Sequence, residues 1–326
     1  NSSVEGFLSS SLDTDWYQIN VTAGQAMSIA LIGTGKTFLK DPILTLYDAN
    51  GIRLLSNDNS GPGYSSLIKN YAYTKTGALY IGVSGYGSGG NYDLSVTAGS
   101  TASFDVKMGA ASLYAADYSY GSWNNGSGLP VTVTYGFRQS AATYSAYGSN
   151  ISTFTQCTAE EMAAVQKITT LYSEICGLTF QQINPGGYTN NATILIGNYL
   201  DYYDSAGAFS YQPGKPASTA STSSAGDLWL NLASVDPKQV SEGSYSFFAI
   251  MHELGHALGL SHPGDYNAGR NAVTYANNAQ FLQDSQQYTV MSYFEGSATG
   301  SSPGGFASAS SLLLYDIFAL QQLSLI

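Results

Sequence analysis

The sequence predicts a multi-domain protein, in which an N-terminal all-β sandwich precedes an α+β domain with a mixed sheet packed with long helices. Three observations support this prediction. The 326 residues suit two domains of ordinary size. Residues 1–99 contain short strand-like runs and no helical pattern, whereas residues 100–326 combine strand patterns with long helical ones. We therefore place the domains at 1–99 and 100–326.

The strand candidates of the first domain are short and separated by Gly, Asn, Asp and Pro. They are WYQINV (16–21), MSIALI (27–32), ILTLYD (43–48) and LYIGV (79–83). Their spacing is typical of a β-sandwich. The stretch TAGSTAS (97–103) is rich in small residues, and we expect it to link the two domains.

The second domain begins with VTVTYGF (131–137), which alternates as a half-buried strand does. A helix is expected over 158–175, because Thr158 and Glu161 can form a capping box and Gly177 can end the helix. The remaining candidates are strands at 178–183, 192–197 and 227–232, and helices at 246–260 and 312–323. This order predicts a sheet with helices packed on it.

The two cysteines, Cys157 and Cys176, lie at the ends of the helix predicted over 158–175. A helix of that length separates its ends by roughly 27 Å, whereas a disulfide needs Cα atoms within about 7 Å. A straight helix therefore predicts two buried free thiols. Cysteine usage then says little about the cellular compartment.

The charge balance argues against some classes of partner. The chain has 11 Lys and Arg against 22 Asp and Glu, for a net charge of −11. Nucleic acids and anionic membranes bind through cationic contacts, so we expect neither as a partner. We also expect no membrane span, because no apolar run approaches the roughly 18 residues of a spanning helix. The sequence begins at Asn1 without an initiator methionine or an apolar leader, which predicts a processed, secreted protein.

All three histidines of the chain lie within one stretch, MHELGHALGLSHPGDY. His252 and His256 are four residues apart, so a helix places both on one face, within reach of one zinc ion at about 2.0–2.1 Å. Gly259 permits a sharp turn out of this helix because glycine adopts positive φ without strain. That turn brings back His262 as a third ligand.

Glu253 follows the first of these histidines and lies to the side, where it can take a proton from a water molecule at the metal. Three protein ligands and one open position are typical of a catalytic zinc site, since a structural site is closed by a fourth ligand. A lone HExxH also arises by chance in helices. The longer HExxHxxGxxH fixes five positions, which favours a zinc site over histidines satisfied within a core.

With HExxHxxGxxH the sequence resembles the metzincins. The continuation HPGDYNAG and the later YTVMSYF resemble specifically the serralysins, a family of secreted bacterial metalloendopeptidases. Weaker matches, among them VTVTYGF, ATILIGNY and YDIFALQQL, extend the resemblance over about residues 104–326. The resemblance implies a metzincin catalytic domain, one catalytic Zn²⁺, polypeptide substrates and an extracellular, bacterial protein.

The resemblance also implies roles for residues outside the zinc motif. Met291 would be the Met-turn methionine beneath the zinc, and Tyr293 a switchable fifth ligand and a phenolic donor to the oxyanion. Asp316 would brace the Met-turn from below. The alternatives are a core methionine, one tyrosine among many and a solvated helix acid.

In the same family GDLWLN is the edge strand to which an extended peptide substrate adds through its main chain. In this chain its residues are Asp227, Leu228, Trp229, Leu230 and Asn231. An ordinary sheet strand is compatible with that role. Serralysins normally continue into glycine-rich nonapeptide repeats that bind calcium and serve secretion, and these 326 residues contain none.

The first domain resembles the bacterial pre-peptidase C-terminal domain through DTDWYQINVTAGQ (13–25), DPILTLYDANG (41–51), SNDNSGPG (56–63) and TGALYIGVSGYGSGGNYDLSV (76–96). Relatives of this domain include calcium-binding and matrix-binding modules, which implies a matrix or surface ligand. Oxygen ligands for Ca²⁺ could come from Asp13, Asp15, Asp41, Asp48, Asn50 and Asp58. Asp-Ala-Asn-Gly and Ser-Asn-Asp-Asn also form turns without an ion.

These observations predict a secreted zinc endopeptidase that acts on extended polypeptides, with Glu253 as general base. Two alternatives remain: a binding protein with an inactive metal site, and a latent enzyme whose N-terminal domain covers the cleft. The intact Glu253 and Tyr293 favour an active enzyme over the binding protein. A Ser/His/Asp mechanism is not expected, because no histidine remains to act as its base.

Overall fold

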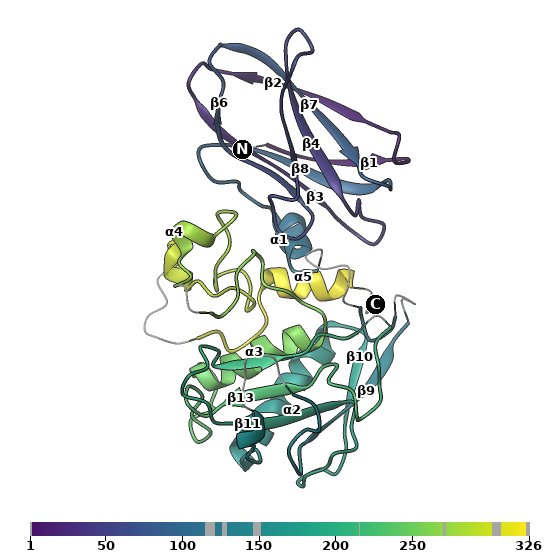
Figure 1. Ribbon diagram of the computed structural model, residues 1–326, viewed down its shortest axis with the longest axis vertical. Helices are drawn as coiled ribbons and strands as arrows, with labels where there is room; N and C mark the ends of the chain where they lie inside the picture. The colour runs from purple at the N-terminus through teal and green to yellow at the C-terminus, as the bar shows by residue number, and fades with distance from the viewer. Residues whose placement is uncertain are drawn as a thin grey trace.

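The structure is a computed structural model that describes residues 2–114, 121–125, 129–145, 151–214, 216–269, 272–301 and 308–323. It has an upper and a lower body along its longest axis (Figure 1). The upper body consists of strands from the first third of the chain. The lower body contains a second sheet with its helices, and two further helices lie between the bodies.

The upper body is a β-sandwich of two four-stranded antiparallel sheets. One sheet has the order β1 (Ser2–Leu8), β8 (Gly90–Ala98), β3 (Ala26–Gly33) and β6 (Ser66–Ala72), and the other has the order β2 (Asp15–Val21), β7 (Gly77–Gly85), β4 (Pro42–Asp48) and β5 (Arg53–Asp58). Alternate side chains of both sheets, such as Leu31 and Ile81, fill the core between them. The predicted sandwich and its four predicted strands are confirmed.

The lower body contains a five-stranded mixed sheet. Its order is β10 (Leu178–Gln182), β9 (Val131–Phe137), β11 (Ile194–Tyr199), β13 (Leu228–Asn231) and β12 (Ala208–Ser210), with β12 alone antiparallel to its neighbour. Helix α2 (Ala159–Ile175) packs on β10, and α3 (Tyr245–Ala257) packs on β12, β13 and α2. The predicted mixed sheet is confirmed, with few helices packed on it.

Helix α2 begins as its sequence predicts. The Thr158 hydroxyl accepts a hydrogen bond from the Glu161 amide, and the Glu161 carboxylate accepts one from the Thr158 amide at 2.7 Å. Cys157 and Cys176 lie at its two ends as buried free thiols, which confirms that prediction. Burial raises the pKa of both thiols, so neither is activated as a nucleophile.

The prediction that residues 227–231 form the edge strand is wrong. Leu228 pairs with Ile196 of β11 on one side and with Ser210 of β12 on the other. The stretch Asp227 to Asn231 therefore lies inside the sheet, and β12 is its edge. The sequence did not reveal β12, because three residues are too few to show an alternating pattern.

The stretch 97–103 does not form a free tether between the two bodies. Ala102 is fully buried and forms a β-bridge with Phe281, which lies far away in the sequence. Helix α1 (Val106–Ser112) follows directly, with Asp105 as its N-cap, and packs on β3 and on α5 (Leu314–Gln322). The domain boundary at 99/100 stays a prediction, although the last sandwich strand ends at Ala98.

The sandwich is attached to the lower body through the outer face of the β1-β8-β3-β6 sheet. Three side chains of that face belong to the large core of the lower body: Ala30, Ile32 and Leu67. Phe104 lies in the same core and stacks on Phe281, with ring centroids 4.1 Å apart. Apolar burial therefore holds the two bodies together.

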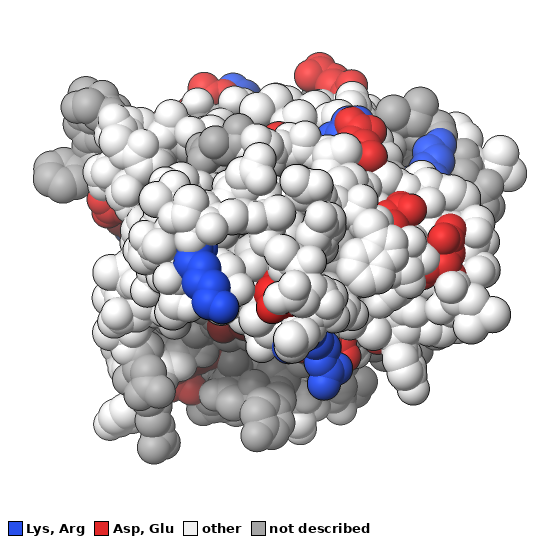
Figure 2. Space-filling view, turned by 90° about the horizontal axis from the view of Figure 1, so that it is seen from above, with Lys and Arg blue, Asp and Glu red and all other residues white. Residues whose placement is uncertain are grey.

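The connecting segments contain short helical turns, at α4 (Tyr275–Asn278), η1 (Ile151–Thr153) and η2 (Gly296–Thr299). Among the helices that the structure describes, none has both the length and the apolar character needed to cross a membrane. On the face shown in Figure 2, the few charged side chains are scattered among uncharged ones. This appearance fits a chain of which only 10% is charged.

A buried acid lies on the sheet face that meets the lower body. Asp93 of β8 is 1% exposed, and neither carboxylate oxygen has a hydrogen-bond partner among the described residues. Burial, together with the nearby carboxylates of Asp105 and Glu5, raises its pKa to about 7, against an opposing effect of Lys107.

We expect Asp93→Asn to change the pH dependence of stability. The folded protein keeps a proton on Asp93 that the unfolded chain releases between about pH 4 and pH 7, so the parent loses stability as pH rises through that window. Each pKa unit corresponds to about 1.4 kcal/mol. Urea unfolding should show the variant to be more stable by a few kcal/mol at pH 8, with a difference that shrinks towards pH 4. Parallel stability profiles of the two proteins would contradict this assignment.

Phe104 and Phe281 stack in the core that joins the sandwich to the lower body. Phe104→Ala should lower the free energy of unfolding by about 3–5 kcal/mol, because it leaves a cavity against Phe281. Leu12→Ala is the matched control, since Leu12 is 94% exposed and should change stability by no more than about 0.5 kcal/mol. Equal midpoints of Phe104→Ala and the parent in urea would show that this contact does not stabilise the fold.

Candidate metal centre

Helix α3 is buried on nearly every side and positions the first two histidines. It begins at Ser244, whose hydroxyl accepts a hydrogen bond from the Phe247 amide at 3.2 Å. It ends at Ala257, and Gly259, with φ +103°, turns the chain out of the helix as the sequence predicts. The Leu260 amide donates back to the Gly255 carbonyl at 3.0 Å, the hydrogen-bond pattern of a glycine-terminated helix.

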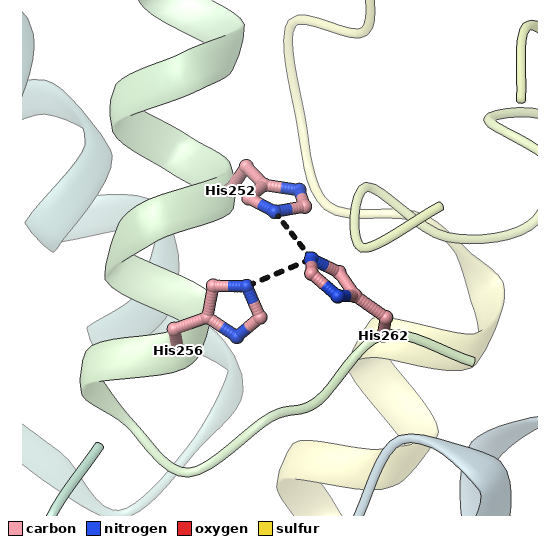
Figure 3. Close-up of side chains that lie close together, drawn as sticks. All are labelled: His252, His256 and His262. Carbon is pink, nitrogen blue, oxygen red and sulfur yellow. Dashed lines mark hydrogen bonds between the residues drawn. The ribbon is translucent and has the colours of Figure 1, made fainter. Parts of the chain in front are cut away.

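The chain after this turn brings His262 back to the helix, where its ring lies opposite those of His252 and His256 (Figure 3). The Nε2 atom of His262 lies 3.2 Å from that of His252 and 3.1 Å from that of His256. Within the described parts of the chain, these residues form the single group of three or more His, Cys, Asp or Glu side chains close enough to share an ion.

The outer nitrogen of each ring is held by a main-chain carbonyl. The Nδ1 atoms of His252, His256 and His262 lie 2.8, 2.7 and 2.8 Å from the carbonyl oxygens of Val290, Leu260 and Tyr266. A carbonyl can only accept a hydrogen bond, so each Nδ1 carries the hydrogen. In a neutral ring Nε2 is then an acceptor without a hydrogen.

Burial keeps these rings neutral. It lowers the pKa of His252 to about 3 and of His256 to about 4, and lowers the pKa of His262 as well. Three lone pairs therefore face one another over short distances, and no hydrogen lies between them. A cation at their common centre removes this repulsion, so the residues present fit a metal ion.

The same geometry fits zinc. Ligands of a tetrahedral ion with bonds of about 2.0–2.1 Å are separated by about 3.3 Å, close to the 3.1 and 3.2 Å found between the Nε2 atoms. The carbonyl partners of Nδ1 are the supports that zinc-binding histidines commonly have. Three histidine ligands would leave one position of a tetrahedral ion open to water or substrate.

Glu253 is buried beside the first histidine. Burial raises its pKa to about 8, and its Oε2 atom has no hydrogen-bond partner among the described residues. A divalent cation nearby would favour the carboxylate over the acid.

The segment 289–293 lies against the triad from the other side. Met291 is fully buried, and its sulfur lies 2.5 Å from where a Cβ atom on Gly255 would be. The Tyr293 ring is centred 4.4 Å from that of His262, and its hydroxyl accepts a hydrogen bond from the Ala268 amide at 3.1 Å. Met291 therefore packs against the metal-site helix, and Tyr293 lines the centre.

Asp316 lies beneath the same segment. It is fully buried and accepts hydrogen bonds from the Thr289 hydroxyl at 2.5 Å and the Val290 amide at 2.9 Å. Val290 is the residue whose carbonyl holds His252. The alternative of a solvated helix acid is wrong for Asp316, because α5 packs this position inwards.

The residues considered for calcium do not come together as one group. Asp13 and Asp48 accept hydrogen bonds from nearby main-chain amides and serve as turn formers, as does the DANG segment that contains Asn50. Asp15 accepts a hydrogen bond from the Tyr92 hydroxyl. Asp41 and Asp58 lie side by side. The pKa of Asp41 is raised mainly by burial and secondly by the carboxylate of Asp58. Calcium stays a prediction, for which these two acids are the remaining candidates.

The structure also shows supporting residues that the sequence did not assign. The Tyr266 carbonyl orients His262, and the Tyr266 ring stacks on the His262 ring with the two centroids 5.5 Å apart. Tyr266 belongs to the HPGDY motif, but the sequence of the motif does not show which atom of Tyr266 supports the histidine. Inside the sheet, Asp227 forms a buried ion pair with Arg138 and accepts a hydrogen bond from the Leu195 amide at 2.7 Å, which is a structural role.

The fold and the centre together define a class of protein. A buried helix with two histidines, a third on the following loop and an acid beside them on a mixed sheet form the arrangement expected of a metallopeptidase.

Comparisons with known proteins agree. Metallopeptidase AprA of Pseudomonas marginalis is 34% identical over 242 residues, 73% of this chain and 48% of that protein. Serralysin of Proteus mirabilis is 33% identical over 60% of this chain and 40% of its own length. Serralysin B of Dickeya chrysanthemi is 34% identical over 47% of this chain and 31% of its own length. The chain thus spans about half the length of these relatives, or less.

Residues 13–85 match the family model of the bacterial pre-peptidase C-terminal domain. The solved pre-peptidase C-terminal domain of a collagenase from Bacillus anthracis is 24% identical and covers 30% of this chain and 89% of that one, at a TM-score of 0.23. The chain is a homologue of the serralysin metalloproteases with an N-terminal pre-peptidase C-terminal domain, and the resemblance predicted from its motifs is confirmed.

The close packing of α3 on Met291 leads to a prediction. Gly255→Ala should destabilise the protein by about 1–3 kcal/mol, because a Cβ atom there would lie 2.5 Å from the Met291 sulfur. The displaced segment should also weaken zinc binding. Urea unfolding and a zinc titration measure the two effects.

Gly269→Ala is the matched control for this substitution. Among the described residues beyond its chain neighbours, the nearest atom to a Cβ on Gly269 lies 3.9 Å away, so the substitution should be neutral or slightly stabilising. If Gly255→Ala behaves like this control, Met291 does not pack against the helix as described.

Proposed function

We propose that the chain is a secreted zinc-dependent endopeptidase that hydrolyses peptide bonds of extended polypeptides. One observation carries the proposal: three Nε2 lone pairs converge, and each ring is fixed by a carbonyl on Nδ1. The homologues named as serralysins and metallopeptidases support the reaction class.

His252, His256 and His262 would hold the ion, which supplies Lewis acidity to the scissile carbonyl and makes a nearby water more acidic. Glu253 would take the proton from the attacking water, because it is the buried carboxylate next to the triad. The same carboxyl would then pass that proton to the leaving amine. Peptide hydrolysis needs no covalent intermediate on the chain in this scheme.

Tyr293 would assist at the oxyanion. Its ring lies against the His252 and His262 rings, and burial together with the Glu253 charge raises its pKa to about 12, so its hydroxyl keeps a hydrogen to donate. Such a donor is most useful when it is aimed at the charge that develops in the transition state. A role as fifth metal ligand in the resting enzyme belongs to the same proposal.

The substrate would add to β12. The Tyr211 amide donates to the Asp227 carbonyl and the Asn231 amide donates to the Gly207 carbonyl, so the odd-numbered residues of this strand bond to β13. In an antiparallel pair the intervening residues, Ala208 and Ser210, then direct their main-chain groups away from the sheet. An extended peptide can pair with them as a further strand.

The latent form, with the N-terminal domain over the cleft, has less support. In the described residues, the sandwich meets the lower body through α1, through the Lys69–Ala279 hydrogen bond and through the shared core that contains Ala30, Ile32 and Leu67. These contacts do not involve the histidines. The inactive binding protein has less support because Glu253 and Tyr293 are both present at the centre. A matrix or surface ligand of the sandwich remains part of the proposal.

The test is cleavage of casein or gelatin by the full chain. Zinc chelation should abolish cleavage, and Glu253→Ala should lower the rate by roughly 100- to 10,000-fold, because the general base is lost. Glu174→Ala is the control, since Glu174 is an exposed acid on α2. The zinc content of each protein is measured in parallel.

Two results would contradict the proposal. Cleavage by Glu253→Ala at the rate of the parent would remove Glu253 from the mechanism. Stoichiometric zinc without cleavage of either polypeptide would favour the binding protein. Faster cleavage by residues 104–326 than by the full chain would instead support the latent form.

A further inference from the structure

A buried carboxylate that the proposed reaction does not use lies next to the metal centre. Asp284 is fully buried, and its Oδ1 atom accepts hydrogen bonds from the Tyr266 hydroxyl at 2.8 Å and the Ser292 hydroxyl at 2.7 Å. These donors belong to two different segments of the chain. Asp284 therefore ties together two segments that both border the triad.

The first segment is the loop that carries His262. The Tyr266 carbonyl accepts the hydrogen bond from His262 Nδ1, and the Tyr266 ring stacks on the His262 ring with an angle of 18° between their planes. Anchoring the hydroxyl fixes the ring, and with it the main chain that holds the histidine. The orientation of the His262 ring thus depends on Asp284 through Tyr266.

The second segment is the turn that carries Tyr293. Ser292 stands between Met291 and Tyr293, and its hydroxyl oxygen accepts a hydrogen bond from the Phe294 amide at 3.1 Å while it donates to Asp284. The Tyr266 and Tyr293 rings also lie in contact, with centroids 5.2 Å apart. Asp284 thus restrains both tyrosine rings, Tyr266 and Tyr293, that lie against the His262 ring.

The other oxygen, Oδ2, has no hydrogen-bond partner among the described residues but is closely packed. A Cβ atom on Gly264 would lie 2.9 Å from the Tyr266 ring and 3.4 Å from Asp284 Oδ2, so glycine is required for the loop to approach this closely. Burial raises the pKa of Asp284 to about 6, while the hydrogen bonds from Ser292 and Tyr266 and the charge of Lys69 act in the opposite direction. Lys69 of the sandwich also donates a hydrogen bond to the Ala279 carbonyl at 3.2 Å.

We infer that Asp284 is a positioning residue of the metal centre: through Tyr266 and Ser292 it holds the carbonyl that orients His262 and the turn that carries Tyr293. The inference rests on the proposed zinc site. Asp284 itself touches neither the metal nor the substrate. Outer-shell partners of zinc ligands commonly change metal affinity by about 10- to 100-fold when they are removed.

The substitutions separate acceptor geometry from charge. Asp284→Ala removes the acceptor, whereas Asp284→Asn keeps an oxygen that can accept both hydrogen bonds. Tyr266→Phe removes one hydroxyl and keeps the ring. Asp93→Ala is the matched control, since Asp93 is an equally buried acid that holds no hydrogen bond among the described residues.

The measurement is the zinc dissociation constant of the full chain, by competition with a chromophoric chelator, with folding checked by circular dichroism and thermal melting. We expect Asp284→Ala to raise this constant about 10-fold or more. Asp284→Asn should stay near the parent, and Tyr266→Phe should show a smaller rise. The double variant of Asp284→Ala and Tyr266→Phe should lose less than the sum of the single losses, because both remove the same bond.

Three outcomes would overturn the inference: a folded Asp284→Ala protein with the zinc affinity of the parent, an equal loss in Asp93→Ala, or an equal loss in Asp284→Asn. If Asp284→Ala does not fold, Tyr266→Phe decides, since parental zinc affinity in that variant has the same meaning. A parent that binds no zinc would contradict the proposed function instead, so the two failures are distinguishable.

Discussion

The structure of the lower body depends on one constraint: three imidazole rings must present their Nε2 atoms to one point. Neutral rings satisfy this constraint when each Nδ1 carries the hydrogen and donates it to a carbonyl, which leaves Nε2 free of hydrogen. The three carbonyls belong to Val290, Leu260 and Tyr266, in three separate segments. The turn at Gly259, the loop after His262 and the segment near Met291 therefore have to be placed together, since an error in any of them would turn one ring away from the centre.

Buried acids secure two of these segments. Asp316 on α5 accepts hydrogen bonds from Thr289 and Val290, and Asp284 accepts them from Tyr266 and Ser292. A buried carboxylate is costly unless it is hydrogen-bonded, so each of these acids is stable only while the segments that it holds stay in place. The same interactions that satisfy the acids thus restrict the motion of the metal-site loops.

The sandwich is a structural part of this arrangement as well as a separate β domain. Its outer sheet face contributes Ala30, Ile32 and Leu67 to the core of the second domain, and Lys69 reaches the segment between the metal loop and Asp284. A domain attached through a shared apolar core has a fixed orientation, unlike one on a flexible linker.

The sequence by itself determined the local features: the capping box of α2, the exit at Gly259, the two histidines on one helix face and the alternating strands of the sandwich. These depend on residues a few positions apart, whose geometry is set by helix and strand periodicity. Tertiary structure alone decided that β12 is the sheet edge, that Asp316 and Asp284 are buried under the metal loops, and that residues 97–103 pack against Phe281. These features arise from contacts between segments far apart in the chain, and no local pattern specifies which distant partner a short strand, an acid or a linker will meet.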